Sequence, residues 1–128
     1  MKPVTQTIFG EPYGNCTAAC IASILDCNLI SVPHFNPEPG ENTDETYWPR
    51  LLTFLESHGL TILFISEEYY KQYPLKPKGY HIANGPAARG LPHSCVMLDG
   101  EIVWDPHPDR TGLKKITDIF LFVPIIKE

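Results

Sequence analysis

The chain has 128 residues, of which 43% are hydrophobic and 20% charged, and its formal net charge is -5. This length favours one domain that buries a core without disulfide bonds. The acidic balance disfavours nucleic acid and anionic membranes as partners, because both require a basic surface. No apolar run is long enough to span a membrane.

The first 13 residues are expected to be extended or irregular, since Pro3 and Pro12 interrupt regular structure. They lack the apolar core of a signal peptide, so we expect a cytoplasmic protein. Free thiols are then expected at all four cysteines, because the cytoplasm is reducing. These are Cys16, Cys20, Cys27 and Cys95. No CxxC or HxxxH unit is present, so neither a structural zinc ion nor another cofactor is expected.

Residues 16–29 give the clearest helix prediction. Asn15 is a suitable N-cap, and apolar residues lie almost all round the helix, which indicates a central, buried position. A second helix is predicted over residues 44–58, with Thr43 before it as a cap and Gly59 ending it. Pro49 places the start of its regular part near Trp48.

Strands are predicted in the rest of the chain, at residues 60–65, 80–83, 93–98, 101–105 and 119–125. Residues 67–78 are expected to form a connection. The dipeptide Asp99-Gly100 predicts a hairpin, and Pro124 places the end of the last strand at a sheet edge. Helices followed by an antiparallel sheet give an α+β fold, in which the helix carrying Cys16 packs on the sheet.

Cys16 has the setting of a nucleophile. Unpaired backbone N–H groups at a helix N-terminus lower the pKa of a thiol there and can stabilise an oxyanion on a substrate. Cys20 lies one turn further in and faces the core, and Cys27 lies near the helix end. A cysteine that serves only as a small buried hydrophobic residue is the structural alternative.

A nucleophilic cysteine needs a base and a group that orients the base, and His93 and Asp105 are the candidates. With a two-residue turn at Asp99-Gly100, Asp105 would lie opposite Ser94, and His93 would point to the other face. A three-residue turn, or a bulge at Gly100, places Asp105 opposite Cys95, diagonal to His93 on the same face. The catalytic interpretation therefore predicts a bulged or three-residue hairpin. His107 is a rival histidine on the same face in that register.

The stretches GNCTAAC (residues 14–20) and PHSCVMLDGEIVWDPHPDR (residues 92–110) together resemble the papain-like cysteine peptidase superfamily. The resemblance is closest to its small bacterial and phage branches, related to bacteriocin-processing peptidases, and covers residues 6–27 and 84–112. It implies a papain-like fold with Cys16 as nucleophile, His93 as general base and acid, and Asp105 as the orienting carboxylate. The superfamily usually has a glutamine about six residues before the cysteine, where this chain has Gly10. Gln6, the Asn15 side chain or the Cys16 backbone N–H would then stabilise the oxyanion.

The residues and the resemblance predict a single-domain cysteine hydrolase, a peptidase, amidase or isopeptidase, that works through a thioester acyl-enzyme without a cofactor. The expected substrate is a peptide or small amide, or a flexible protein tail, because a chain this short should have a shallow cleft. Arg89 is a candidate for binding a substrate carboxylate. Tyr13 and Trp104 are candidates for lining an apolar cleft.

Three other functions remain open from the sequence. The same triad serves acyl and amine transferases, since fold and triad do not select the acceptor. A non-catalytic binding module would keep the fold without needing a reactive thiol. A metal site would combine Cys16 and His93 with His107 or Asp105. The sequence does not indicate an oligomeric state.

Overall fold

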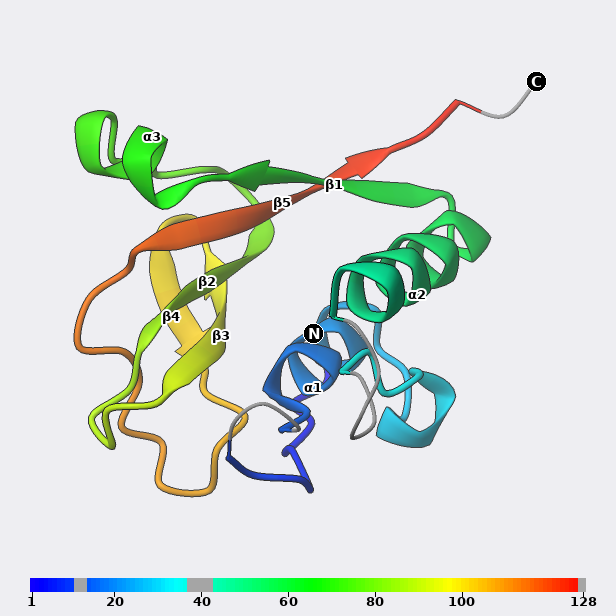
Figure 1. Ribbon diagram of the computed structural model, residues 1–128, viewed down its shortest axis with the longest axis horizontal. Helices are drawn as coiled ribbons and strands as arrows, with labels where there is room; N and C mark the ends of the chain where they lie inside the picture. The colour runs from blue at the N-terminus through cyan, green and yellow to red at the C-terminus, as the bar shows by residue number, and fades with distance from the viewer. Residues whose placement is uncertain (11–13, 37–42, 127–128) are drawn as a thin grey trace.

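The computed structural model describes residues 1–10, 14–36 and 43–126 (Figure 1). Its elements, in chain order, are α1 (Cys16–Ile24), the short 3-10 helix η1 (Leu29–Ser31), α2 (Thr43–Ser57), β1 (Leu60–Ile65), α3 (Glu67–Gln72), β2 (Tyr80–Pro86), β3 (Pro92–Leu98), β4 (Glu101–Trp104) and β5 (Asp118–Pro124). The α+β class and the antiparallel sheet predicted from the sequence are therefore confirmed.

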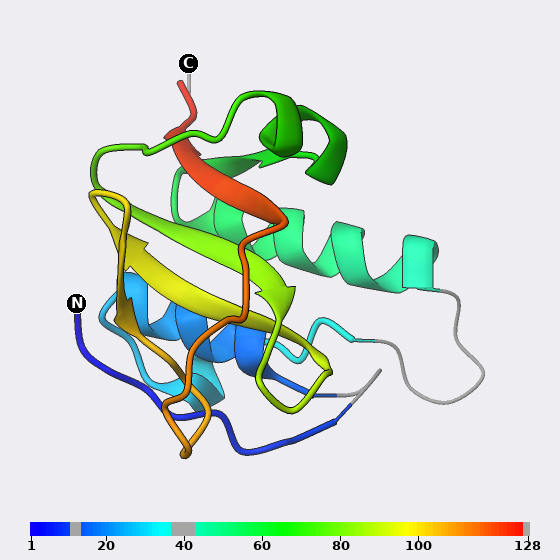
Figure 2. The same ribbon diagram turned by 90° about the vertical axis from the view of Figure 1, so that its left-hand side faces the viewer.

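The sheet has the strand order β1-β5-β2-β3-β4, and all neighbours are antiparallel. Helix α1 packs on β3 and β2, and α2 packs on β1, as Figures 1 and 2 show. The main core lies between these helices and the sheet and includes Ile21, Phe35, Leu51, Leu55, Ile82, Val96 and Phe120. The predicted packing of the cysteine-bearing helix on the sheet is thus confirmed.

A smaller apolar cluster covers the other face of the sheet. Its buried members are Ala83, Met97 and Ile119, and α3 contributes Tyr70 to it. The segment after β4 contributes Leu113. In the part of the chain that the structure describes, no helix is long and apolar enough to cross a membrane.

Helix α1 is shorter than predicted, because it ends at Ile24 rather than near residue 29. Asp26 adopts a left-handed backbone conformation with φ 55°. The N–H of Cys27 then donates to the carbonyl of Ala22 at 3.0 Å, which is the hydrogen bond of a Schellman-type helix end. A single residue in the left-handed region therefore ends a helix whose apolar pattern continues.

Helix α2 is longer at its start than predicted, and Pro49 lies inside it. A proline here removes one intrahelical hydrogen bond, but the packing of Leu51 and Leu55 in the core retains the helix. The prediction that its regular part begins near Trp48 is wrong for this reason. Helix α3, which lies in the predicted connection, begins at a Ser66 cap whose Oγ accepts from the N–H of Tyr69.

The hairpin between β3 and β4 carries the extra residue that the catalytic interpretation requires. Asp99 and Gly100 have φ of 51° and 85° and form a two-residue turn, so Leu98 pairs with Glu101. A bulge then shifts the register between Met97 and Val96, and Val96 pairs with Trp104. The predicted register is confirmed, although the extra residue lies at the bulge and not at Gly100.

The remaining strands differ from the predictions at their ends. Strand β2 extends to Pro86 rather than to residue 83, and β5 runs from Asp118 to Pro124. Strand β5 is central in the sheet, yet β2 pairs only with its first four residues. Pro124 pairs with Leu60 of β1 alone, so its missing N–H faces an open side, as expected of a proline at a local edge.

Candidate active site

The thiol of Cys16 lies at the first position of α1, on the wall of a cavity. Cys16 is partly exposed, whereas Cys20 and Cys95 are fully buried. Burial raises the pKa of both the Cys20 and the Cys95 thiol. Of these three, Cys16 is therefore the cysteine best placed to act as a nucleophile.

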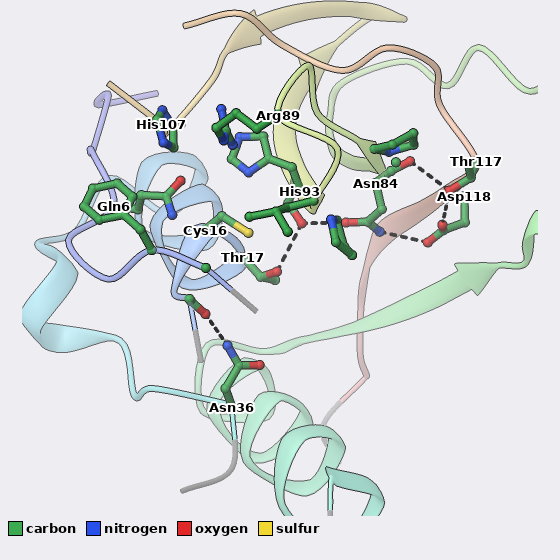
Figure 3. A pocket seen from close by; sticks show the side chains of 18 of the residues that line it. Gln6, Cys16, Thr17, Asn36, Asn84, Arg89, His93, His107, Thr117 and Asp118 are labelled. Atoms are coloured by element: carbon green, nitrogen blue, oxygen red, sulfur yellow. Dashed lines mark hydrogen bonds between the residues drawn. The ribbon is translucent and has the colours of Figure 1, made fainter. Parts of the chain in front are cut away.

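His93 and Asp105 form a buried hydrogen-bonded pair next to this thiol. The distance from His93 Nε2 to Asp105 Oδ1 is 2.6 Å, and their side chains are 2% and 4% exposed. Asp105 also accepts from the backbone N–H groups of His107 (2.9 Å) and Gly112 (2.7 Å). These contacts fix the carboxylate and the ring plane, and they leave His93 Nδ1 to face Cys16 (Figure 3).

The electrostatics of the site shift the Cys16 thiol toward its thiolate form and the His93 ring toward its protonated form. Burial alone raises the pKa of Cys16, but the hydrogen bond and charge of His93 and the hydrogen bond from the backbone N–H of Ser94 outweigh it, so the pKa of the thiol lies below its ordinary value. Burial lowers the pKa of His93, but its hydrogen bonds with Cys16 and Asp105 raise it above the ordinary value. Burial raises the pKa of Asp105, but hydrogen bonds from His93 and from backbone N–H groups hold it below the ordinary value.

Gln6 reaches the site because the N-terminal segment folds back over the start of α1. Its backbone N–H donates to Pro106 O at 3.0 Å, and its side chain is buried on the cavity wall. Gln6 Nε2 donates one hydrogen bond to Ile8 O at 3.0 Å, which leaves its second N–H. Figure 3 shows this amide on the side of the cavity near Cys16, where it could meet a substrate oxyanion.

Asn15 holds that segment in place and does not contact the cavity. Its Oδ1 accepts from the N–H groups of Thr7 (3.0 Å) and Ile8 (2.9 Å), and its Nδ2 donates to Thr7 Oγ1 (3.0 Å). The residue occupies the N-cap position of α1, but its side chain makes no capping hydrogen bond. The structure therefore corrects the prediction for Asn15, since its polar atoms position Gln6 instead of facing the oxyanion.

The cavity beside Cys16 has a volume of about 840 Å³, which is in the range of small-molecule binding pockets. This is larger than the shallow cleft expected for so short a chain. Among the described residues its wall consists of Gln6, Phe9, Gly10, Gly14, Cys16, Thr17, Asn36, Tyr47, Trp48, Asn84, Gly85, Pro86, Arg89, Gly90, Leu91, Pro92, His93, Ser94, His107, Thr117, Asp118 and Phe120.

The other predicted binding residues have different positions. Arg89 lines the cavity and pairs with Asp109 at 2.5 Å. Trp104 does not line it; its Nε1 donates to Val4 O at 2.8 Å, and its ring packs against the core. The prediction for Trp104 is therefore wrong, because β4 turns this side chain toward the N-terminal segment. Tyr13 lies outside the described residues.

His107, the rival histidine, lines the cavity beside His93 but does not replace it. The two ring centroids lie 6.1 Å apart. His107 Nδ1 accepts from the backbone N–H of Asp109 at 3.1 Å, so in the neutral ring Nε2 carries the proton. The imidazole that forms a hydrogen bond with the Cys16 thiol is that of His93, which favours His93 as the base.

A polar chain on the opposite wall was not found by sequence reasoning. Thr17 Oγ1 lies 3.1 Å from Ser94 Oγ, which donates to Asn84 Oδ1 at 2.6 Å. Asn84 Nδ2 donates to Asp118 Oδ2 at 3.0 Å. In the sequence, the polar residues at strand ends could have indicated this chain. Only the pairing of β2 with β5, however, brings Asn84 and Asp118 together.

Among the described residues, one buried group has the residue types and spacing to ligate a metal ion. His93, Cys95 and Asp105 bring ligand atoms within 4.8 Å of one another. Burial and the nearby Asp105 charge raise the pKa of the Cys95 thiol, which donates a hydrogen bond to Asp105. A protonated thiol is a poor metal ligand, so this donor set suits hydrogen bonding better. In this part of the chain neither Cys16 nor His107 belongs to such a group.

Arg110 fixes the loop that carries Asp105. Its Nη1 donates to Asp105 O (2.9 Å) and His107 O (2.7 Å), its Nη2 donates to Thr5 Oγ1 (3.0 Å), and its guanidinium lies 4.1 Å from the Trp104 ring centroid. We expect Arg110→Met to lower the free energy of unfolding by about 1–2 kcal/mol, because these hydrogen bonds are lost while the aliphatic contact remains.

Urea denaturation monitored by tryptophan fluorescence measures this change. The control is Lys76→Met, which removes an exposed ion pair with Glu101 and should change the stability by less than about 0.5 kcal/mol. Equal effects of the two substitutions would contradict the role given to Arg110.

Comparisons of the chain with models of protein families, with curated proteins and with solved structures found no match. The fold and the site themselves define an α+β protein with a cysteine–histidine–aspartate arrangement at a cavity. The resemblance to papain-like peptidases stays a prediction.

Proposed function

We propose that this protein is a cysteine-dependent amide hydrolase of the papain-like type that acts through a thioester acyl-enzyme. The observation that carries the proposal is the line from Cys16 through His93 to Asp105 at the wall of a cavity. A nucleophile, a base and an orienting group within hydrogen-bonding reach form the generalised triad. A merely structural cysteine would not need a neighbour that lowers its pKa.

The first half of the proposed reaction forms the thioester. The Cys16 thiolate attacks the carbonyl carbon of the amide, so a C–S bond forms and the carbonyl oxygen becomes an oxyanion. This oxyanion accepts hydrogen bonds from Gln6 Nε2 and from the backbone N–H of Cys16. When the carbonyl re-forms, the C–N bond breaks, and the leaving nitrogen takes the proton held on His93 Nδ1.

The second half regenerates the enzyme. Neutral His93 takes a proton from a water molecule while the water oxygen attacks the thioester carbon. The C–S bond then breaks, the acyl group leaves as a carboxylic acid, and the Cys16 thiolate faces the His93 imidazolium again. Asp105 keeps the ring oriented through both halves. An amine in place of water would make the same site an acyl transferase.

The proposed substrate is a small amide or a flexible peptide tail, acted on in the cytoplasm. The cavity volume of about 840 Å³ supports this size class. Arg89 offers a guanidinium at the wall, although Asp109 already pairs with it, so it would position a substrate carboxylate in exchange for part of that ion pair.

The pH dependence of Cys16 alkylation by iodoacetamide tests the proposal, with labelling followed peptide by peptide by mass spectrometry. Because His93 holds the pKa of the thiol below its ordinary value, we expect selective labelling of Cys16 at about pH 6, where an ordinary thiol is mostly protonated. In His93→Ala the labelling should move to the alkaline range of an ordinary thiol. Labelling of the native protein that begins only above about pH 8 and ignores His93 would contradict the proposal.

A further inference from the structure

A second charged group, Asp118, lines the same cavity away from the triad. Figure 3 shows Asp118 with Asn84 and Thr117 on the opposite side of His93 from Arg89 and His107. Cys16 thus lies between the part of the wall that carries the Arg89 guanidinium and the part that carries the Asp118 carboxylate. The triad chemistry described above does not use Asp118.

The sheet register places Asp118 on this wall. Asp118 pairs with Asn84, and Phe120 pairs with Ile82. Alternate residues of a strand point to the same face, so Asp118 and Phe120 face the side on which α1 and α2 pack. Phe120 belongs to the core cluster on that side, while Asp118 lies two residue pairs nearer the end of the sheet, where the cavity opens.

The carboxylate of Asp118 is oriented by neutral donors. Its Oδ2 accepts from Asn84 Nδ2 at 3.0 Å, and its Oδ1 accepts from Thr117 Oγ1 at 2.7 Å. Among the described residues no lysine or arginine forms an ion pair with it. Asp109 differs, since it pairs with Arg89. The negative charge of Asp118 is therefore held in place but not neutralised.

Aromatic rings line the cavity next to this carboxylate. Trp48 contacts Phe120 with 5.8 Å between ring centroids, and Tyr47 contacts Trp48 at 5.2 Å. All three rings belong to the cavity wall. Burial raises the pKa of Tyr47 to about 12, and the charge of Asp118 contributes to this rise, so the phenol stays neutral close to the carboxylate. Aromatic rings beside a fixed carboxylate are usual surroundings of a bound organic cation.

We propose that Asp118, with the Tyr47, Trp48 and Phe120 rings, binds an ammonium or guanidinium group at the end of an aliphatic chain. This assignment rests on the proposed function for one point, that the bound cation is part of the molecule whose carbonyl meets Cys16. The polar chain from Thr17 through Ser94 and Asn84 connects the two places. The preferred substrates are then amides of lysine-like or arginine-like character.

Binding of small amides to the full chain, measured by isothermal titration calorimetry, tests the assignment without relying on turnover. The ligands are Nα-acetyl-lysine amide, Nα-acetyl-arginine amide and the neutral Nα-acetyl-norleucine amide, which keeps the aliphatic chain of lysine without its ammonium group. We expect the preferred cationic ligand to bind about tenfold more tightly than norleucine amide at low salt, and comparison of the two cations identifies the group. In Asp118→Asn the ratio should fall to about one, whereas in the control Asp109→Asn it should persist.

The salt dependence of the native protein provides a measurement that needs no variant. Raising the ionic strength from about 0.02 M to about 0.5 M should reduce the preference severalfold, because the added ions screen the attraction. Equal affinity for the cationic and neutral amides in the native protein, or a preference that survives in Asp118→Asn, would overturn the assignment.

The same ligands separate this inference from the proposed function. If Cys16 alkylation shows an ordinary thiol while cation binding depends on Asp118, the subsite stands and the hydrolase proposal fails. If Cys16 is activated by His93 but the ligands bind without a cationic preference, the hydrolase proposal stands and the subsite fails.

Discussion

Replacing His93 with glutamine is expected to slow acylation of Cys16 by about 1,000-fold at neutral pH. The ring lowers the pKa of the thiol and takes up its proton, so that the native site attacks as a thiolate. Glutamine keeps a polar side chain of similar length but cannot take up a proton. The measurement is the pre-steady-state burst of p-nitrophenol from p-nitrophenyl acetate, an activated ester that reports acylation before the natural substrate is known.

Two further variants serve as controls for this result. Cys16→Ala should remove the burst entirely, because no thioester can form. His58→Gln changes an exposed histidine directly after α2 that contacts Phe54, and it should leave the burst unchanged. A His93→Gln burst within about threefold of the native rate would exclude His93 as the base, since general base catalysis contributes at least about 100-fold.

The pairing of His93 with Asp105 could be reasoned from the sequence because it depends on local chain geometry. Asp99-Gly100 fixes the position of the turn, and the alternation of strand side chains then leaves only two registers. A functional interpretation selected the register with one extra residue, and the sheet has it. The position of the bulge did not follow, because no residue type between Val96 and Trp104 requires it.

The oxyanion side of the site was harder to predict, because it depends on the N-terminal segment folding back over the start of α1. Gln6 was a candidate only by residue type. Its placement needs the clamp from Asn15 to Thr7 and Ile8, and a side chain at an N-cap position normally bonds the helix instead. Tertiary contacts therefore overrode the local preference of Asn15.

For the Asp118 wall, the part of the cavity wall formed by Asp118, Asn84 and Thr117, polar residues at strand ends were the local signal, and this signal does not show which strands pair. Asn84 and Asp118 are far apart in the chain, and they meet because β5 inserts between β1 and β2. A sequence that ends in a strand does not reveal whether that strand lies at an edge or in the centre of the sheet. Long-range strand order, rather than the strands themselves, was the missing information.

Substitution of Gly85 by alanine is expected to lower the free energy of unfolding by about 3 kcal/mol, because over-packing forces backbone to move. Gly85 pairs with His93 in the sheet, and an added Cβ would lie far inside van der Waals contact with the carbonyl oxygen of Lys115. That segment is held along β2 by the bond from Thr117 N–H to Asn84 O at 2.8 Å, so relief of the clash would also disturb the Asp118 wall.

The matched control for Gly85→Ala is Gly90→Ala, in the same stretch of the cavity wall. Gly90 has φ 86° and open space where a Cβ would be added, so only the backbone cost of about 1 kcal/mol is expected. Urea denaturation of both variants, read as free energies of unfolding, separates a steric cause from a conformational one. If Gly85→Ala lowers the free energy of unfolding no more than Gly90→Ala does, the steric explanation is wrong. The backbone around Lys115 would then move away from the added Cβ at little cost, despite the close approach of the two backbones.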